Sequence, residues 1–290
     1  MTVAYEVLVF YALLVVWLAT LIYGIRQRRF WPFAVFGMLL MAVLNVRYFI
    51  DGPPAAISFF VGIYDVFDNL GLGSGEGAPA LAQCADNACT VWGDRYLYHP
   101  AWGVAFYDRF VSGPALRTNL LYGHIFFNSI AFVLMHVQLA RPGVGRNRQR
   151  HRLLGRVSFA SLTAGTICAT WLASEHGAVE EYGAGAAELG FYSMSAIVYL
   201  TAVLGIVAAR QGDVDRHRRW MIRHIGSMWG AFWLFRVMLV VTGPLLRNYE
   251  TVSLLLSIWL SAPLGVLLAE YLFRRRRTAG ITQTRVALPT

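Results

Sequence analysis

The 290-residue sequence contains no lysine and few charged residues of any kind. All 25 basic residues are arginine, and charged residues make up 14% of the chain, against about a quarter in a typical soluble domain. Hydrophobic residues make up 57%, and the mean hydropathy is +0.50. Because this apolar content exceeds what a soluble core buries, the composition excludes an ordinary soluble domain and predicts an integral membrane protein.

The sequence also lacks the motifs of soluble enzymes. It has no G-x-S-x-G, Walker loop, H-E-x-x-H or dinucleotide fingerprint, and the glycine-rich stretch Gly73–Gly77 follows no strand. No catalytic residue is therefore predicted, and enzymatic activity stays an open question. The net charge of +9 does not indicate nucleic acid, because the arginines lie in short segments between apolar runs, where they set topology and meet anionic lipid headgroups.

Only 3 cysteines occur, and no signal peptide is recognisable at the start of the chain. Cys168 lies inside an apolar segment, whereas Cys84 and Cys89 lie close together in a long polar stretch. In an oxidising compartment Cys84 and Cys89 could form a disulfide that closes a small loop. The first apolar run lacks a basic start and a small-residue cleavage pattern, so we expect it to be kept as a helix.

Several apolar segments are long enough to cross a bilayer as helices. The seven segments cover about residues 5–24, 32–50, 118–140, 156–174, 189–210, 225–246 and 252–273. Pro263 is expected to kink the last one. The predicted fold class is all-α integral membrane, as a seven-transmembrane-helix bundle.

The charges of the connections predict how this bundle is oriented. Four arginine-rich segments fall on one side: Arg26–Arg29, residues 141–156, residues 210–223 and Arg274–Arg277. The connections on the other side lean acidic. By the positive-inside rule the N-terminus lies outside and the C-terminus in the cytoplasm.

The long connection at residues 51–117 is expected to be a periplasmic insertion with short interfacial helices. Ala55–Tyr64 is apolar but too short to span, and Trp92–Phe110 has the Trp and Tyr density of a headgroup-level belt. The predicted domains are two N-terminal transmembrane helices at 1–50, this insertion at 51–117, a four-helix core at 118–246, a seventh helix at 247–273 and a cytoplasmic tail at 274–290.

Residues 118–246 resemble a known family. The resemblance rests on His124, His151-Arg152, Gly155-Arg156, Gly190-Phe191, the string His217–Arg223 (HRRWMIR) and Arg236. Together they resemble an uncharacterised family of predicted bacterial membrane proteins, domain-of-unknown-function family 2306. The resemblance implies fold and topology but no reaction. The expected location is the inner (cytoplasmic) membrane of a bacterium, crossed several times.

One face of the segment 118–140 carries a stripe of hydrogen-bonding and sulfur side chains. His124, Asn128, Met135 and Gln138 fall within roughly 40° of one another at helical spacing. Such a stripe faces protein rather than lipid, so it indicates either interhelical hydrogen bonds or the wall of a ligand or cofactor site. His136 is rotated by about 120° from His124, which argues against two stacked haems.

Arg236 lies near the middle of the sixth segment, where a charge costs about 2.5–3.5 kcal/mol on insertion scales. It must pair, bond to carbonyls or line a wet cavity, and the candidate partners are Glu175, Glu188, His124 or a ligand anion. We predict that His124, Asn128 and Arg236 face one outer-half cavity between the third and sixth helices, roofed by the aromatic part of the insertion.

These residues lead to a prediction of cofactor or small-ligand binding. The predicted binding residues are His124, Asn128, Arg236 and His176, with His124 and His176 as metal ligands if the cofactor is haem b. A quinone is the alternative, and electron transport would be the setting for either. Two other functions stay open: an accessory subunit that docks on other membrane-protein subunits through the insertion, and a transporter or sensor of an anionic or lipidic solute.

A second predicted site lies on the cytoplasmic side. Its residues are Arg152, Arg156, Arg218, Arg219 and Arg223, each near the start of a helix whose N–H groups favour anions. They could bind a phosphate, a carboxylate or an anionic lipid headgroup. The alternative is a positive-inside anchor of snorkelling arginines.

Overall fold

The computed structural model describes residues 5–27, 31–50, 52–53, 70–71, 109–111, 113–140, 148–175, 183–246 and 249–286. Across these ranges the regular structure is helical, without a strand. The helices are α1 (Tyr5–Gln27), α2 (Trp31–Ile50), α6 (Ala115–Ala140), α7 (Arg148–Ser174), α8 (Ala184–Arg210), α9 (Val214–Trp229), α10 (Phe235–Leu245) and α11 (Glu250–Val286). A π-helical turn, η6 (Gly230–Leu234), joins α9 to α10.

Seven stretches of the described residues are long and apolar enough to cross a membrane, which confirms the predicted all-α class and span count. They are Leu8–Gln27, Trp31–Ile50, Ala115–Leu139, Arg148–Ser174, Ala184–Arg210, Val214–Gly243 and Thr251–Leu272. The sixth stretch contains α9, η6 and α10, so a π-turn interrupts the α-helix near its middle.

Two helices begin earlier than predicted, because α7 starts at Arg148 rather than near 156 and α9 at Val214 rather than near 225. The two arginine-rich strings at 151–156 and 217–223 are therefore helical turns. Arginine, leucine and methionine are good helix formers, so a charge can end an apolar run without ending a helix. The carboxylate of Asp213 caps α9 by accepting a hydrogen bond from the backbone N–H of Arg216 at 2.8 Å.

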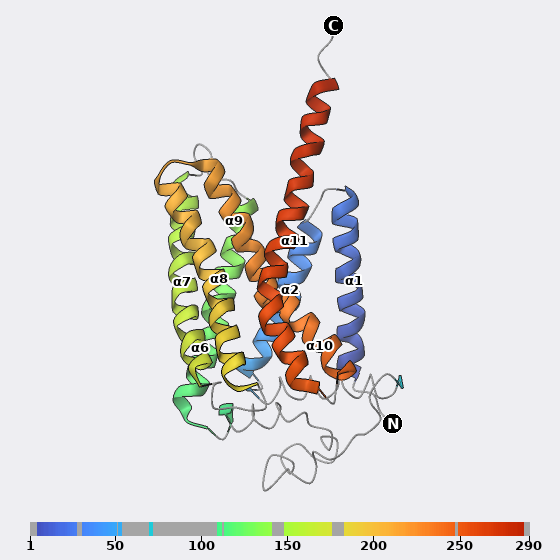
Figure 1. Ribbon diagram of the computed structural model, residues 1–290, viewed down its shortest axis with the longest axis vertical. Coiled ribbons are helices and arrows are strands. Elements are labelled where there is room, and N and C mark those ends of the chain that lie inside the picture. Colours follow the sequence, from blue (N-terminus) through green and yellow to red (C-terminus); the bar gives the residue numbers. More distant parts are fainter. Residues whose placement is uncertain are drawn as a thin grey trace.

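The last helix also extends beyond its prediction. α11 runs to Val286, although its membrane-spanning stretch ends at Leu272. Residues 274–286 of the predicted tail are thus helical, and α11 projects past the other helices at that end of the molecule (Figure 1).

Successive long helices run in opposite directions, so their ends sort into two groups (Figure 1). The end of α1, the starts of α7 and α9 and the C-terminal part of α11 lie at one end of the bundle. The starts of α6 and α8 lie at the other. The end of α1 and the arginine-rich starts of α7 and α9 thus share one end of the molecule, whereas Arg117, near the start of α6, lies at the other.

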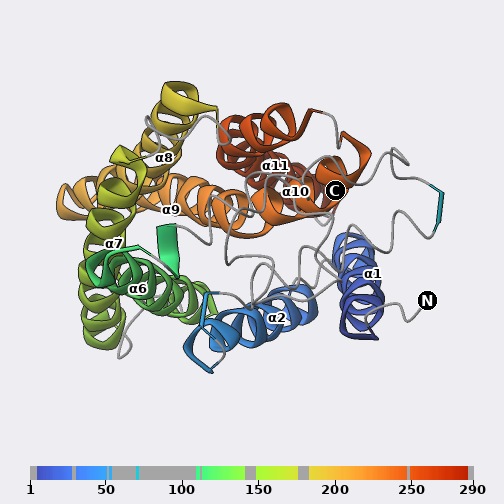
Figure 2. The same ribbon diagram turned by 90° about the horizontal axis from the view of Figure 1, so that it is seen from below.

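The sixth span lies in the middle of the bundle, with α2 and α6 on one side of it and α8 and α11 on the other (Figure 2). Its Trp229 stacks on Phe33 at 5.0 Å between ring centres, and Phe33 stacks on Trp17 at 4.7 Å. Through this aromatic stack α1 and α2 pack against the central span. A Cβ added at Gly37 would lie 2.6 Å from the Trp229 ring, so glycine is needed there for the ring to fit.

The sixth span meets α11 through glycines on both helices. A Cβ added at Gly226 would lie 2.5 Å from the carbonyl oxygen of Gly265, and one at Gly230 would collide with the backbone of Ser261. Gly226 and Gly230 are four residues apart, the small-xxx-small spacing that lets membrane helices approach closely. The π-turn η6 begins at Gly230, within this close approach, and Arg236 lies in the next turn.

Candidate ligand-binding site

An open groove of about 560 Å³ lies between α7 and α8. Its lining residues are Thr163, Thr166, Ile167, Thr170, Trp171, Ser174, Tyr192 and Tyr199. The hydroxyl residues of α7 recur every three or four positions, and the two tyrosines of α8 are seven apart, so each set occupies one helix face. The volume lies within the range of small-molecule sites, roughly 300–1,000 Å³.

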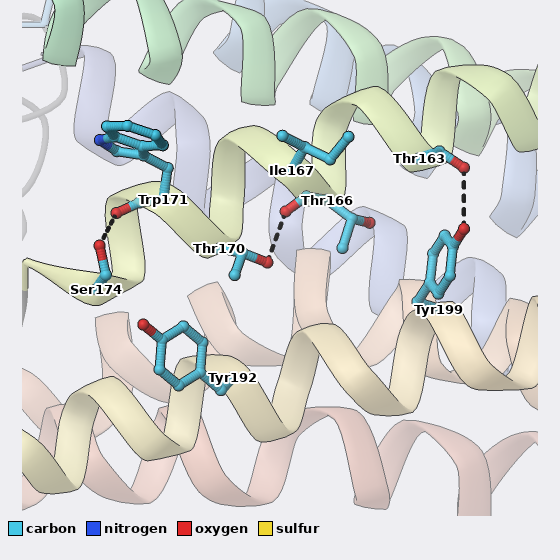
Figure 3. A pocket seen from close by; sticks show the side chains of 8 residues that line it. All are labelled: Thr163, Thr166, Ile167, Thr170, Trp171, Ser174, Tyr192 and Tyr199. Carbon is cyan, nitrogen blue, oxygen red and sulfur yellow. Dashed lines mark hydrogen bonds between the residues drawn. The ribbon is translucent and has the colours of Figure 1, made fainter.

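The two walls of the groove face each other through hydroxyl groups. Figure 3 shows Thr163, Thr170 and Ser174 on the side of α7 toward α8, and Tyr192 and Tyr199 extending from α8. The hydroxyl oxygens of Thr163 and Tyr199 lie 3.3 Å apart and close one end of the groove. The site therefore combines a polar edge with flat apolar rings.

The rim of the groove is exposed at the bundle surface. Ile167 is 62% exposed and Trp171 56%, so the groove opens sideways from the bundle rather than into its centre. In a membrane this opening would face the lipid, and a ligand could enter from the bilayer.

The predicted polar stripe of α6 lies against α7, not in this groove. The Nδ1 atom of His124 lies 3.3 Å from the carbonyl oxygen of Gly165 and 3.0 Å from Nδ2 of Asn128. A Cβ added at Gly165 would lie 2.6 Å from Asn128, so the amide fits only because residue 165 is glycine. A Cβ at Gly155 would likewise touch Gln138, at 3.3 Å. His124, Asn128 and Gln138 thus lie at the α6–α7 interface.

His136, which helical spacing rotates away from the face of α6 that carries His124, contacts a different helix. Its Nδ1 lies 2.7 Å from the carbonyl oxygen of Phe132, and its Nε2 accepts a hydrogen bond from the indole N–H of Trp229 at 2.8 Å. Both ring nitrogens are therefore occupied in a residue that is 2% exposed. This arrangement leaves no nitrogen for a haem iron.

Arg236 is held within the central span. Its Nη1 donates a hydrogen bond to the carbonyl oxygen of Phe232 at 2.7 Å, and its guanidinium lies 4.2 Å from the centre of the Phe232 ring. The cavity expected between His124 and Arg236 stays a prediction, because neither residue lines the groove between α7 and α8.

Glu175, one of the candidate partners of Arg236, pairs with two other arginines. Its Oε2 lies 2.6 Å from Nε of Arg117 and 3.2 Å from Nη2 of Arg109. Arg109 is 6% exposed and also donates a hydrogen bond to the carbonyl oxygen of Leu172 at 3.2 Å. Sequence reasoning missed this cluster, because Glu175, just after the end of α7, lies 66 residues from Arg109 in the chain.

The five arginines of the predicted anion site do not form a single cluster of free cations. Arg152, Arg156, Arg218 and Arg219 are exposed. The fifth, Arg223, pairs with Glu270 of α11 at 2.5 Å and lies 4.4 Å over the ring of Trp220. Anion binding by these residues stays a prediction.

Histidines 151 and 217, near the starts of α7 and α9, lie side by side. Their ring centres are 6.4 Å apart, although the residues are 66 positions apart in the chain. The two similar arginine-rich strings therefore meet at one end of the bundle. In the part of the chain that the structure describes, no group of three or more His, Cys, Asp or Glu side chains could hold a metal ion.

Several predicted features lie outside the described residues: His176, Cys84, Cys89 and nearly all of the insertion at 51–117. The disulfide, the second haem ligand and the docking surface for other subunits are therefore untested. Cys168 lies within α7 as a free cysteine.

Comparison with known proteins identifies a family. The model of the family described as "Predicted membrane protein (DUF2306)" matches residues 121–273, more than half of the chain. The match confirms the resemblance found at 118–246 and extends it through the spanning part of α11. No curated protein and no solved structure matches the chain.

Proposed function

We propose that this chain, which belongs to the DUF2306 family of predicted membrane proteins, binds a small ligand of the bilayer with a quinone-like ring. The proposed location is a bacterial inner membrane, with the N-terminus outside and the C-terminus in the cytoplasm. The gathering of the arginine-rich helix ends at one end of the bundle supports this orientation (Figure 1).

In this orientation the groove between α7 and α8 lies in the outer half of the membrane. It is lined by α7 from Thr163 to Ser174 and by Tyr192 and Tyr199 of α8, so it extends from about the middle of both helices toward the end opposite the arginine-rich one. The depth agrees with the outer-half site expected from the sequence, although the helices that form the groove are different.

The groove itself is the observation that supports ligand binding. A lipid-facing opening admits molecules that are dissolved in the bilayer, the aromatic side chains offer flat contact, and the hydroxyls offer a polar edge. A substituted quinone ring, flat with oxygens at its edge, has this combination of surfaces. No residue of the groove has the arrangement of a nucleophile with a base, so we propose binding and no reaction.

Calorimetric titration of the purified full-length protein in mild detergent tests this function. A short-chain benzoquinone, or the corresponding hydroquinone, should bind saturably with one site per chain. Thr166→Phe, which places a ring inside the groove, should abolish binding. The matched control is Leu200→Phe, because Leu200 is 54% exposed on α8 and does not line the groove. Binding that survives Thr166→Phe unchanged would refute the site.

Haem b at His124 is the second candidate. If Nδ1 of His124 carries the proton, it donates a hydrogen bond to the carbonyl oxygen of Gly165. Such a bond fixes the orientation of the ring and leaves Nε2 as the nitrogen that could bind a metal. If Asn128 donates to Nδ1 instead, the proton is on Nε2 and ligation is blocked. A Soret band in the purified protein that disappears in His124→Ala would support haem. The absence of this band from protein purified from haem-supplied cells would rule haem out.

A further inference from the structure

The same tripeptide, Arg-His-Arg, occurs near the start of two helices of the bundle. It occupies residues 150–152 of α7 and residues 216–218 of α9, 66 positions apart. His151 is the fourth residue of α7 and His217 the fourth of α9, so the two tripeptides have the same place relative to their helix starts. Their histidines lie together, with ring centres 6.4 Å apart.

The two hairpins that carry these tripeptides are packed alike. In the first hairpin, Ser158 of α7 donates a hydrogen bond to the carbonyl oxygen of Ala131 on α6, at 3.2 Å. In the second, Nδ1 of His224 on α9 lies 3.1 Å from the carbonyl oxygen of Val198 on α8. Positions 158 and 224 are again 66 apart, and their two partners are 67 apart. The two tripeptides therefore hold equivalent places in two similar hairpins.

The four arginines of the tripeptides are exposed: Arg150, Arg152, Arg216 and Arg218. Among the residues that the structure describes, none of these four forms an ion pair. The arginine-rich segments 141–156 and 210–223 contain eleven arginines and two carboxylates, those of Asp213 and Asp215. Asp213 is already used as the cap of α9. This end of the bundle therefore carries a local excess of positive charge.

Helix geometry sorts the four arginines into two pairs. Successive residues of an α-helix are rotated by about 100° about its axis, so the arginines before and after each histidine lie on opposite sides of it. α7 and α9 both start at the same end of the bundle and run in the same direction (Figure 1). For two such helices with facing histidines, the residue after the histidine on one helix lies on the same side as the residue before it on the other. Arg152 is therefore on the side of Arg216, and Arg150 is on the side of Arg218. These two pairs are called the double clamp below.

The double clamp lies at the depth of lipid headgroups in a membrane. Beside it on α7, Leu153 is 62% exposed and Val157 is 44% exposed. Arg152 precedes Val157 by five residues, which is about 7.5 Å along the helix. This distance is similar to the thickness of one headgroup layer, roughly 5–8 Å. A lipid phosphate at that level can reach the arginines while its acyl chains contact the apolar surface of α7.

We propose that the double clamp binds a lipid with two phosphate groups, of the diphosphatidylglycerol class, at the arginine-rich end of the bundle. Each arginine pair binds one phosphate, because a guanidinium donates parallel N–H bonds to two phosphate oxygens. Once the first phosphate is bound, binding of the second is intramolecular, and this raises the affinity without any new type of contact. This site is separate from the groove between α7 and α8 and from the ligand proposed there.

Titration of the purified full-length protein with lipid, followed by native mass spectrometry, tests the proposal. The ligands are diphosphatidylglycerol, phosphatidylglycerol with the same acyl chains, and the water-soluble headgroup that remains when diphosphatidylglycerol is deacylated. At equal phosphate concentration, diphosphatidylglycerol should bind at least about tenfold more tightly than phosphatidylglycerol. The soluble headgroup should bind at least about tenfold more weakly than the lipid, because it has no acyl chains to contact the apolar surface.

A pair of double variants separates the double clamp from general attraction to positive charge. Arg152→Gln combined with Arg216→Gln removes both members of one pair, so diphosphatidylglycerol should then bind no more tightly than phosphatidylglycerol. The matched control is Arg26→Gln combined with Arg210→Gln. Arg26 and Arg210 are exposed in the last turns of α1 and α8, at the same end of the bundle but outside the tripeptides. The control should keep the preference for the two-phosphate lipid, and both double variants should elute like the parent protein in gel filtration.

Three results would overturn the proposal. Equal affinities of the two lipids for the parent protein would show that the arginines do not distinguish one phosphate from two. Loss of the preference in the control as complete as in Arg152→Gln with Arg216→Gln would show that only total charge matters. Binding of the soluble headgroup as tight as that of the lipid would show that the ligand is a dissolved anion and not a lipid.

Discussion

Single hydroxyl groups form the polar edge of the groove, and none of them stands out in the sequence. The α7 stripe can be seen at three- and four-residue spacing once it is sought: Thr163, Thr166, Thr170 and Ser174. Such residues usually bond to their own helix, so the stripe alone does not predict a site. The site exists because Tyr192 and Tyr199 face it from another helix, and sequence spacing within one helix cannot reveal that pairing.

The histidines of α6 illustrate the opposite case, in which helical geometry was sufficient. The rotation of His136 away from His124 could be derived from residue number, and the two rings do contact different helices. The sequence could not supply the identity of their partners. Trp229 is 93 residues from His136, and only the packing of the sixth span against α6 brings the two together.

This contact predicts a specific loss of stability. In Trp229→Phe the ring stacking with Phe33 can be kept, but the Nε2 atom of the buried His136 loses its donor. Leaving such a group unsatisfied costs about 1–3 kcal/mol, so the thermal unfolding midpoint in detergent should fall by about 5 °C. Trp171→Phe, at an exposed position without such a bond among the described residues, is the control and should unfold like the parent protein. Equal midpoints for both variants would contradict this account.

At the scale of whole helices, hydropathy predicted the number of spans better than it predicted helix ends. The arginines of 148–156 and 214–223 lower the local hydropathy without breaking the helix, so the predicted starts of α7 and α9 fell too late. The π-turn η6 has no sequence signal that we recognise. It lies where Gly230 meets the backbone of α11, a contact between helices rather than a property of one.

Gly230 provides a prediction at this scale. A methyl group there would meet backbone atoms of Ser261 and Ala262, which cannot rotate away as a side chain can. Gly230→Ala should therefore push the sixth span and α11 apart and lower the yield of folded protein in gel filtration. Gly185→Ala, whose added methyl meets nothing within 4 Å, should fold as well as the parent. Normal folding of Gly230→Ala would show that the two helices can separate without cost.

For the molecule as a whole, alternating helix direction and arginine placement predict one orientation. A reporter fused after Arg277 should read as cytoplasmic, and one inserted near Gly75 as periplasmic. The proposed groove depth depends on this result, because the groove extends from about the middle of its helices toward the end opposite the arginine-rich one. Two reporters on the same side would disprove the orientation and with it the outer-half position of the site.

The long last helix has a consequence for the C-terminus. From the end of its spanning stretch at Leu272 to Val286, α11 continues for fourteen residues, which is about 21 Å at 1.5 Å per residue. This distance is more than twice the Debye length of about 8 Å at physiological ionic strength. In the proposed orientation the rod therefore carries Val286 beyond the electrostatic reach of the lipid headgroups, into water where contacts with other molecules are set by the helix itself and not by the charge of the membrane.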